Sequence, residues 1–407
     1  MFLPIKCVSF RGATWCACYN SFAIVVLCLT LSSIVGTRVK GREQVVFQSN
    51  TSGFPCTRIP AALAVPHTDV ILAFAECRKW AGDQCFVGDV KNASRGGQFN
   101  RSICLRRSVD GGDHWGELQI NITNRYSANP SALYHENYGQ VMLFFDETTT
   151  GRMFYSASKD EGRTWGEAVS VKDSSGQEVL GVAGPGNSVA TLSNGDMLIA
   201  VYHASRSWTK MFSYASVLRS KDGGVTWEDV SPFDTKMGKK MFPHLGEPSL
   251  TVLPNKGNVV VLDSRCPDGR RPYPGPSIPC DCLCRGVSVS TDGGETWGDM
   301  VYDKAVPDPN CQGAVLALRN ESIAFSNANS PTHRINPSVR LGEVAANGLS
   351  VNWADTVTLL ANEGTSAGYS SLFETSNGRI GVLWESEGDQ PSRGCHGEGC
   401  SIVLSFL

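Results

Sequence analysis

The chain has 407 residues, of which 41% are hydrophobic and 18% charged, and it contains 42 glycines. This composition can bury a large core, and the many turn-forming glycines favour short β-strands. The formal net charge of -3 and the isoelectric point near 6.2 exclude nucleic-acid binding that rests on global charge.

The N-terminus carries an apolar run at residues 22–35, preceded by the basic residues Lys6 and Arg11. At about 1.5 Å per residue this run is shorter than the ~30 Å hydrocarbon core of a bilayer. We therefore expect residues 1–36 to be a signal peptide or an uncleaved signal anchor, either of which directs the chain into the secretory pathway. Asn-x-Ser/Thr sequons that fit this route stand at Asn50, Asn92, Asn100, Asn121 and Asn320.

Cysteine usage points the same way. Four of the 15 cysteines lie in the presumed leader, and the odd number left implies at least one free or intermolecular thiol. Cys280, Cys282 and Cys284 alternate, which on a strand puts all three on one face. Their spacing matches no zinc signature, so we expect disulfides of an oxidising compartment and no metal site. Cys395 and Cys400 could close a small local loop.

The first predicted element after the leader is a β-hairpin. Apolar runs at residues 59–65 and 70–74 flank a Pro-His-Thr-Asp turn signal. In a hairpin, the start of the first strand and the end of the second lie side by side, which puts Arg58 at the same edge as Glu76 and Arg78. Two guanidiniums with a carboxylate suit an anion-binding site.

This hairpin pattern recurs along the chain. Each copy has a small or Pro-containing start, an apolar strand, a turn, and a second apolar strand that ends in polar residues. The further copies lie at residues 130–146, 187–202, 248–265, 313–326 and 370–385.

A second repeat, Ser-x-Asp-x-Gly-x-x-Trp, alternates with the hairpins and begins at Ser108, Ser158, Ser220 and Ser290. Each copy, here called an Asp box, predicts a strand that ends at Ser, a turn whose Asp accepts backbone N–H groups, and a Trp packed beneath it. Residues 347–353 resemble a degenerate fifth box. We assign these boxes a structural role and no catalysis, and they leave the function open.

Hairpins followed by such turns, at a period of roughly 55 to 70 residues, predict four-stranded blades. The fold class is therefore expected to be all-β, a six-bladed β-propeller over residues 37–407. The last hairpin is followed only by the strand-like segment 401–407, so one strand is missing. Residues 44–48 could supply it, closing the ring by pairing the two ends of the chain.

Equivalent strand ends of a propeller converge on its axis, so the hairpins bring polar residues into one central pocket. Three well-spaced arginines, Arg58, Arg265 and Arg334, can surround one carboxylate. Arg340 is an alternative to Arg334. The same reasoning places these further residues near the axis: Glu76, Arg78, Asp146, Glu147, Tyr202, Glu247, Tyr369 and Glu385.

From about Val45 to the C-terminus the chain resembles animal exo-α-sialidases, most of all the lysosomal type. The resemblance is carried by Arg58-Ile-Pro, Phe74-Ala-Glu-Cys-Arg78, the four Asp boxes, His333-Arg-Ile-Asn-Pro-Ser-Val339, Gly368-Tyr-Ser-Ser-Leu372 and Val382-Leu-Trp-Glu385. Thr57 departs from the family, which often has an aromatic residue there.

The resemblance implies a role for each matching residue. Arg58, Arg265 and Arg334 would bind the carboxylate of sialic acid, and Glu385 would brace Arg58. Tyr369 would be the nucleophile with Glu247 as its general base, and Glu76 and Arg78 would support the first arginine and contact the C4 side of the substrate. Asp83 would be the acid/base, with Asp89 as a competitor, because the loop after Arg78 is longer here than in the lysosomal type.

The resemblance therefore implies a retaining exo-sialidase that needs no cofactor and acts on sialylated glycoconjugates. A phenol suits this substrate, because an Asp or Glu nucleophile would be repelled by the carboxylate on the anomeric carbon. A trans-sialidase and a non-catalytic sialic-acid-binding propeller are the alternatives. The lysosomal likeness also implies a lysosomal or extracellular location, with or without a membrane anchor, and a stabilising protein partner or homo-oligomer.

Overall fold

The structure is a computed structural model. It describes residues 6–10, 13–17, 37–38, 43–79, 101–179, 181–204, 213–234, 239–243, 245–256, 258–266, 282–386 and 401–407. The chain forms two compact units, Met1–Val35 and Gly36–Leu407. The first contains a hairpin of β1 (Lys6–Phe10) and β2 (Ala13–Ala17). None of the helices within the described ranges has the length and apolarity to cross a membrane. The leader at residues 1–36 stays a prediction.

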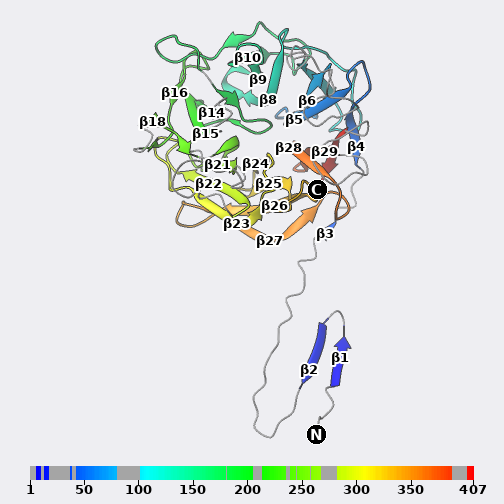
Figure 1. The fold of residues 1–407 in the computed structure, drawn as a ribbon. Helices are drawn as coiled ribbons and strands as arrows, with labels where there is room; N and C mark the ends of the chain where they lie inside the picture. The colour runs from blue at the N-terminus through cyan, green and yellow to red at the C-terminus, as the bar shows by residue number, and fades with distance from the viewer. Residues whose placement is uncertain are drawn as a thin grey trace, which may run out of the picture. The chain divides into compact units, whose positions relative to one another are not determined.

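The second unit consists of antiparallel sheets that follow one another around a common centre (Figure 1). Blade one contains β5 (Cys56–Ala64), β6 (Ile71–Arg78) and β7 (Arg101–Ser108). Blade two contains β8 (Ser127–His135), β9 (Gln140–Glu147), β10 (Arg152–Ser158) and β11 (Val169–Ser170). Blade three contains β12 (Val182–Ala183), β13 (Val189–Thr191), β14 (Met197–Ala204), β15 (Ser213–Ser220) and β16 (Glu228–Asp229), with β19 (Phe242–Pro243) beside β15.

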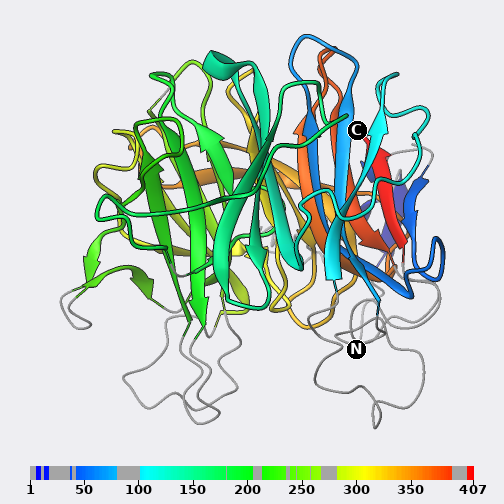
Figure 2. The same cartoon turned by 90° about the horizontal axis from the view of Figure 1, so that it is seen from above.

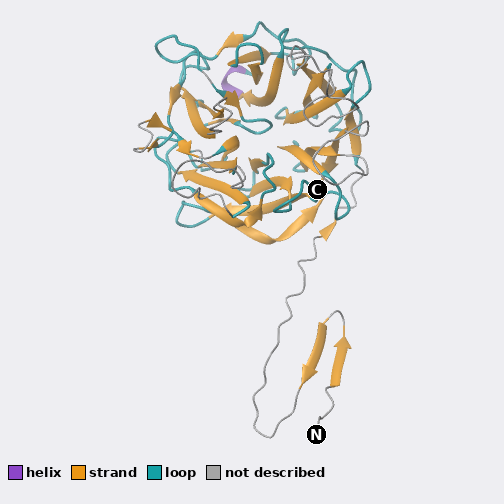
Figure 3. Ribbon diagram, viewed as in Figure 1, coloured by secondary structure: helices purple, strands orange, loops and turns teal. Residues whose placement is uncertain are grey.

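Blade four contains β20 (Gly246–Val252), β21 (Val260–Arg265), β22 (Cys284–Ser290) and β23 (Val301–Pro307). Blade five contains β24 (Ala314–Ala317), β25 (Ile323–Ala328), β26 (Pro337–Val344) and β27 (Val351–Leu359), with β3 (Thr37–Arg38) parallel to β27. Blade six contains β28 (Ala367–Glu374), β29 (Ile380–Ser386), β30 (Ser401–Phe406) and β4 (Gln44–Gln48). A small ribbon, β17 (Phe233–Asp234) and β18 (Lys239–Lys240), and the single turn η3 (Glu136–Tyr138) complete the described elements (Figure 3).

The expected all-β, six-bladed propeller is confirmed. An innermost strand of each blade contacts an innermost strand of the next, so β5, β8, β13, β20, β24 and β28 form a ring around the axis. Apolar side chains of each blade are buried against the neighbouring blade. Phe74, for example, packs between blades one and two, and Leu262 between blades three and four. The hydrophobic core is therefore divided among the junctions between blades.

The ring closes as predicted, by pairing of the chain's two ends. The N-terminal strand β4 pairs antiparallel with the C-terminal strand β30, with Phe47 opposite Ile402. The red strand β30 lies beside the blue strand β4 in both views (Figure 1, Figure 2). Phe47, Ile402 and Leu404 are buried in one cluster with residues of blade one. Blade six is thus a composite of both ends of the sequence.

The Asp boxes have the predicted turn geometry. The third strand of a blade ends at the serine of each box, Ser108, Ser158, Ser220 or Ser290. In blade four, Asp292 Oδ1 accepts the N–H of Thr296 at 2.8 Å, and Gly294 has a φ of +89°. Trp297 Nε1 donates to the carbonyl of Val230 at 3.0 Å, so the tryptophan ties its blade to the preceding one.

The cysteines form disulfides as expected, but one stretch has a different geometry. Cys77 and Cys104 join β6 to β7, and Cys282 bonds Cys284. Cys282 and Cys284 do not share one strand, because Leu283 has a φ of +52° and β22 begins only at Cys284. Cys311 is a free, buried thiol. Cys280, Cys395 and Cys400 lie outside the described residues.

The closure of the ring can be tested at two positions of β4. Phe47 is 2% exposed and Val45 is 54% exposed. Phe47→Ala should lower the free energy of unfolding by about 3 to 5 kcal/mol, because a buried aromatic side chain is replaced by a cavity. Val45→Ala, the matched control, should cost less than about 1 kcal/mol. Urea denaturation measures both, and equal effects would show that packing of β4 does not close the ring.

Candidate active site

Four innermost strands begin with a β-bulge at the same end of the propeller. The register shifts lie between Arg58 and Ala61, Ala128 and Ser131, Gly246 and Ser249, and Ala367 and Ser370. The bulged residues Ile59, Asn129 and Glu247 have φ values of +56°, +51° and +47°. Each precedes a proline, which has no N–H to give to a ladder and is tolerated at bulges. A bulge re-aims side chains, and here it directs polar groups to the axis.

Glu385, on β29, anchors two parts of the site at once. Its Oε1 accepts from Arg58 Nε at 3.0 Å and from the N–H of Ile59 at 2.8 Å. Its Oε2 accepts from Arg58 Nη2 at 2.9 Å and from the N–H of Tyr369 at 3.0 Å. A Cβ on Gly368 would lie 2.1 Å from Glu385 Oε2, so only glycine leaves room for this carboxylate. The bidentate pair fixes the plane of the Arg58 guanidinium.

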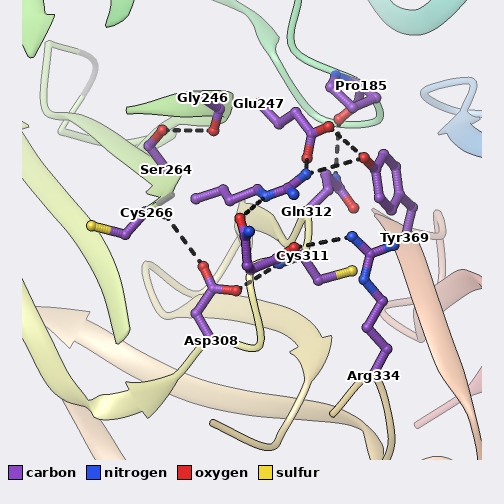
Figure 4. Close-up of polar contacts among 12 residues, drawn as sticks. Pro185, Gly246, Glu247, Ser264, Cys266, Asp308, Cys311, Gln312, Arg334 and Tyr369 are labelled. Carbon is purple, nitrogen blue, oxygen red and sulfur yellow. Dashed lines mark hydrogen bonds and ion pairs between the residues drawn. The ribbon is translucent and has the colours of Figure 1, made fainter. Parts of the chain in front are cut away.

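Tyr369 and Glu247 meet at the axis from blades six and four. The phenol hydroxyl donates to Glu247 Oε1, and Glu247 Oε2 accepts from Arg265 Nη1 (Figure 4). Arg265 Nη1 also lies 3.3 Å from the phenol oxygen. Arg58 and Arg334 flank the ring of Tyr369, with guanidinium carbons 5.1 Å and 5.7 Å from its centroid. A buried phenol is thus paired with a carboxylate and surrounded by three cations.

The pKa shifts of this pair have opposite directions. Burial raises the pKa of Tyr369, and the neighbouring Glu247 raises it further against the opposing arginines. Burial also acts to raise the pKa of Glu247, but the Arg265 guanidinium and the Tyr369 hydroxyl outweigh it and lower that pKa below its usual value. The proton therefore rests on the phenol, and the carboxylate is positioned to accept it.

A carboxyl cluster lies beside these groups at the ends of β6 and β9. Glu76 Oε2 accepts from Arg78 Nε at 2.8 Å and from Arg101 Nη1 at 3.2 Å, while Oε1 accepts the N–H of Asn129 at 2.9 Å. Burial opposes ionisation of Glu76, but Arg101 and Arg78 together lower its pKa to about 2. Glu76 is consequently an ionised, fully engaged carboxylate.

The pKa of Asp146, in the same cluster, is shifted in the opposite direction to that of Glu76. It is 4% exposed, and it accepts from Asn129 Nδ2 at 3.0 Å and from the N–H of Ala183 at 2.9 Å. Burial raises the pKa of Asp146 to about 8, against the effect of these two donors. Asn129 thus links two carboxyl groups of different charge near neutral pH, with Glu76 ionised and Asp146 protonated.

A chain segment of blade three, residues 185–187, contacts blades five and six near Tyr369. Gln312 Nε2 donates to the carbonyls of Pro185 at 3.1 Å and Ser370 at 3.0 Å. The side chain of Asn187 donates to the carbonyl of Leu372 at 2.9 Å and accepts the N–H of the same residue. These contacts join blades three, five and six close to the site.

The structure brings most of the predicted residues into one connected site. Contacts link Arg58, Glu385, Tyr369, Glu247 and Arg265, and Arg334 lies beside the phenol ring, as described above. Glu76 and Arg78 pair with each other in the adjacent cluster. Arg340 lies in β26, with Asp303 and Asp355 as its charged neighbours. Asp83 and Asp89 lie outside the described residues.

The site also contains residues that sequence reasoning did not single out. Asn129 could have been found, since it precedes Pro130 as Glu247 precedes Pro248 in an equivalent hairpin. Arg101, Asn310 and Gln312 follow no such pattern. No group of His, Cys, Asp and Glu side chains suited to hold a metal ion occurs in the part of the chain that the structure describes.

The sialidases among its sequence relatives place the chain among the glycoside hydrolases of the sialidase type. The chain belongs to the BNR repeat-like domain family, whose model matches residues 89–382. Sialidase-3 of Rattus norvegicus is 27% identical over 317 residues, which are 70% of this chain and 68% of that protein. The exo-alpha-sialidase of Arthroderma benhamiae is 27% identical over 387 residues, 87% of this chain and 84% of that protein. The solved structure of a Hadza microbial sialidase has the same fold, with a TM-score of 0.65 at 20% identity, over 90% of this chain and 68% of that one.

The raised pKa of Asp146 gives stability a defined pH dependence. Because the pKa in the folded state, about 8, lies above the ordinary value of 3.8, the contribution of Asp146 is full below pH 3.8 and is lost as pH rises through 8. Relative to Asp146→Asn, the wild-type free energy of unfolding should fall by up to about 1.4 kcal/mol per pH unit within this window.

Urea denaturation at several pH values between 4.5 and 7.5 measures this difference. Asp113→Asn makes the same substitution at an exposed position and serves as the control. Parallel pH profiles for wild type and Asp146→Asn would contradict a neutral, buried Asp146.

Proposed function

We propose that the protein is an exo-α-sialidase that hydrolyses terminal α-linked sialic acids from glycoproteins, oligosaccharides or gangliosides with retention of configuration. The observation that carries this proposal is the hydrogen bond from the Tyr369 hydroxyl to Glu247 in a pocket flanked by Arg58, Arg265 and Arg334. The sialidases among the sequence relatives support the same substrate class.

The three arginines would bind the carboxylate of the substrate. Arg58 enters from blade one with its plane fixed by Glu385, and Arg265 and Arg334 enter from blades four and five. Guanidiniums pair with carboxylates through parallel hydrogen bonds and are always charged. Such a cage would orient the anomeric carbon above the phenol oxygen of Tyr369. Glu76 and Arg78 would contact the C4 side of the sugar from the adjacent cluster.

The reaction would proceed in two displacements. In the first, Tyr369 gives its proton to Glu247, the phenolate oxygen bonds the anomeric carbon, and the leaving oxygen takes a proton from the acid as the glycosidic bond breaks. In the second, the same residue, now a base, deprotonates a water molecule whose oxygen attacks the anomeric carbon. The bond to Tyr369 breaks, and the phenolate oxygen takes its proton back from Glu247. The phenol starts neutral, so the substrate carboxylate meets no negative nucleophile during binding.

The acid/base is assigned to Asp83, with Asp89 as the alternative, both in the segment after β6. The leader at residues 1–36 and the disulfides fit entry into the secretory pathway and a lysosomal or extracellular location. The proposal also includes a membrane anchor at the N-terminus and either a stabilising protein partner or a homo-oligomer.

The nucleophile can be tested with Tyr369→Phe. Loss of the hydroxyl should lower kcat by roughly a thousandfold or more, because the covalent step has no other phenol in this position. Release of free sialic acid from a fluorogenic sialoside measures the rate, and thermal unfolding checks that the variant folds. Wild-type activity in the folded variant would remove this mechanism.

The acid can be identified by comparing leaving groups in Asp83→Ala and Asp89→Ala. Loss of the true acid should slow cleavage of an alkyl sialoside by roughly a hundredfold or more, since its alkoxide leaves poorly without a proton. Cleavage of an aryl sialoside with an acidic phenol should suffer much less. The other variant is the internal control and should slow both substrates equally or not at all. A leaving-group effect in neither variant would place the acid elsewhere.

A further inference from the structure

The loop between β23 and β24, residues 308–312, contacts several parts of the site. Cys311 packs against Ile59 and Tyr369 in a small buried cluster at the axis. Gln312 exchanges hydrogen bonds with the backbone of Ser370, accepting its N–H at 2.8 Å. The loop therefore contacts the nucleophile's own strand and blade one at once.

Asn310 of this loop contacts two of the three arginines through different groups. Its side-chain Oδ1 accepts from Arg265 Nε at 2.6 Å, and its backbone carbonyl accepts from Arg334 Nη2 at 3.0 Å. The φ of Asn310 is +61°, a left-handed conformation that asparagine tolerates better than most residues. This conformation lets the side chain and the carbonyl of one residue face two arginines from different blades.

The loop is held from behind by a fully buried arginine. Arg285 donates to Asp308 Oδ2 at 3.1 Å and to the carbonyl of Cys311 at 2.7 Å, and it also pairs with Asp263. Asp308 Oδ1 in turn accepts the N–H of Cys311 at 2.8 Å. A buried charge with this many partners keeps one geometry, because any movement leaves it uncompensated. Asn310 therefore projects from a rigid support.

We propose that Asn310 is a positioning residue that sets the spacing and orientation of Arg265 and Arg334 for one substrate carboxylate, an inference that rests on the proposed sialidase function. Arg265 is otherwise drawn to Glu247 through Nη1. The hydrogen bond from Arg265 Nε to Asn310 holds the guanidinium at a second point. The guanidinium plane therefore keeps its orientation when the Glu247 side chain moves. Its Nη2 group is then presented to the substrate carboxylate beside Arg334.

The test uses Asn310→Gly, which keeps the left-handed backbone and the carbonyl to Arg334 but removes the acceptor for Arg265. Competitive inhibition is measured with free sialic acid and with its C1 carboxamide, a neutral analogue of nearly the same shape. The inhibition constant for sialic acid should rise about tenfold, as expected for one hydrogen bond to a charged group, while that for the amide changes less than about twofold. Asn310→Ala, which also strains the backbone, should weaken sialic acid further.

Asn124→Gly is the matched control, since Asn124 is exposed, has a φ of +52° and precedes β8 of blade two. It should leave both inhibition constants unchanged. Equal weakening of acid and amide in Asn310→Gly would indicate general loosening and overturn the proposal, as would no change for the acid. A wild-type protein that releases no sialic acid overturns the proposed function as well, so the two failures are distinguished by the wild-type assay.

Discussion

The carboxylate of Glu385 is the contact on which the rest of the site depends. It satisfies the Arg58 guanidinium and the backbone N–H groups of Ile59 and Tyr369, and all of these groups are buried. Breaking a buried ion pair by removing one partner costs roughly 3 to 5 kcal/mol. Glu385 lies on β29, whose outer neighbour β30 pairs with β4. The pairing that closes the ring therefore also supports the strand on which Glu385 joins the backbone of Tyr369 to Arg58.

Backbone distortion is the second device that builds the pocket. The side chains of a regular strand would point alternately into the two neighbouring blade junctions. Only backbone groups would then face the axis. The bulges at Ile59, Asn129 and Glu247 interrupt that alternation at one end of the ring, with left-handed φ values that disfavour β-branched and bulky residues. The cost of these conformations is met by the hydrogen bonds that they create, such as that from the N–H of Ile59 to Glu385.

Repeats in the sequence were enough to predict the propeller and the inner strand ends. The hairpin period and the Asp boxes are local patterns, and a count of strands predicted that β4 would complete blade six. Equivalent positions in successive hairpins placed Arg58, Glu247 and Tyr369 at one axis. Asn310 could not be found this way, because its role comes from two arginines that only tertiary structure brings to it. The raised pKa of Asp146 likewise arises from burial, and the turn at Leu283 from a local conformation that residue alternation does not reveal.

Arg265 couples binding to chemistry in the proposed mechanism. Before substrate binds, its guanidinium lowers the pKa of Glu247 while burial raises that of Tyr369, so transfer of the phenol proton is uphill. Arg265 also lies 3.3 Å from the phenol oxygen, so a substrate carboxylate that offsets its charge would raise the pKa of both Glu247 and Tyr369. The charge of the substrate therefore acts on the proton donor and on the proton acceptor through the same guanidinium. A neutral sugar of similar shape would leave the charge of Arg265 in place, so the charge of the substrate bears on the proton transfer as well as on binding.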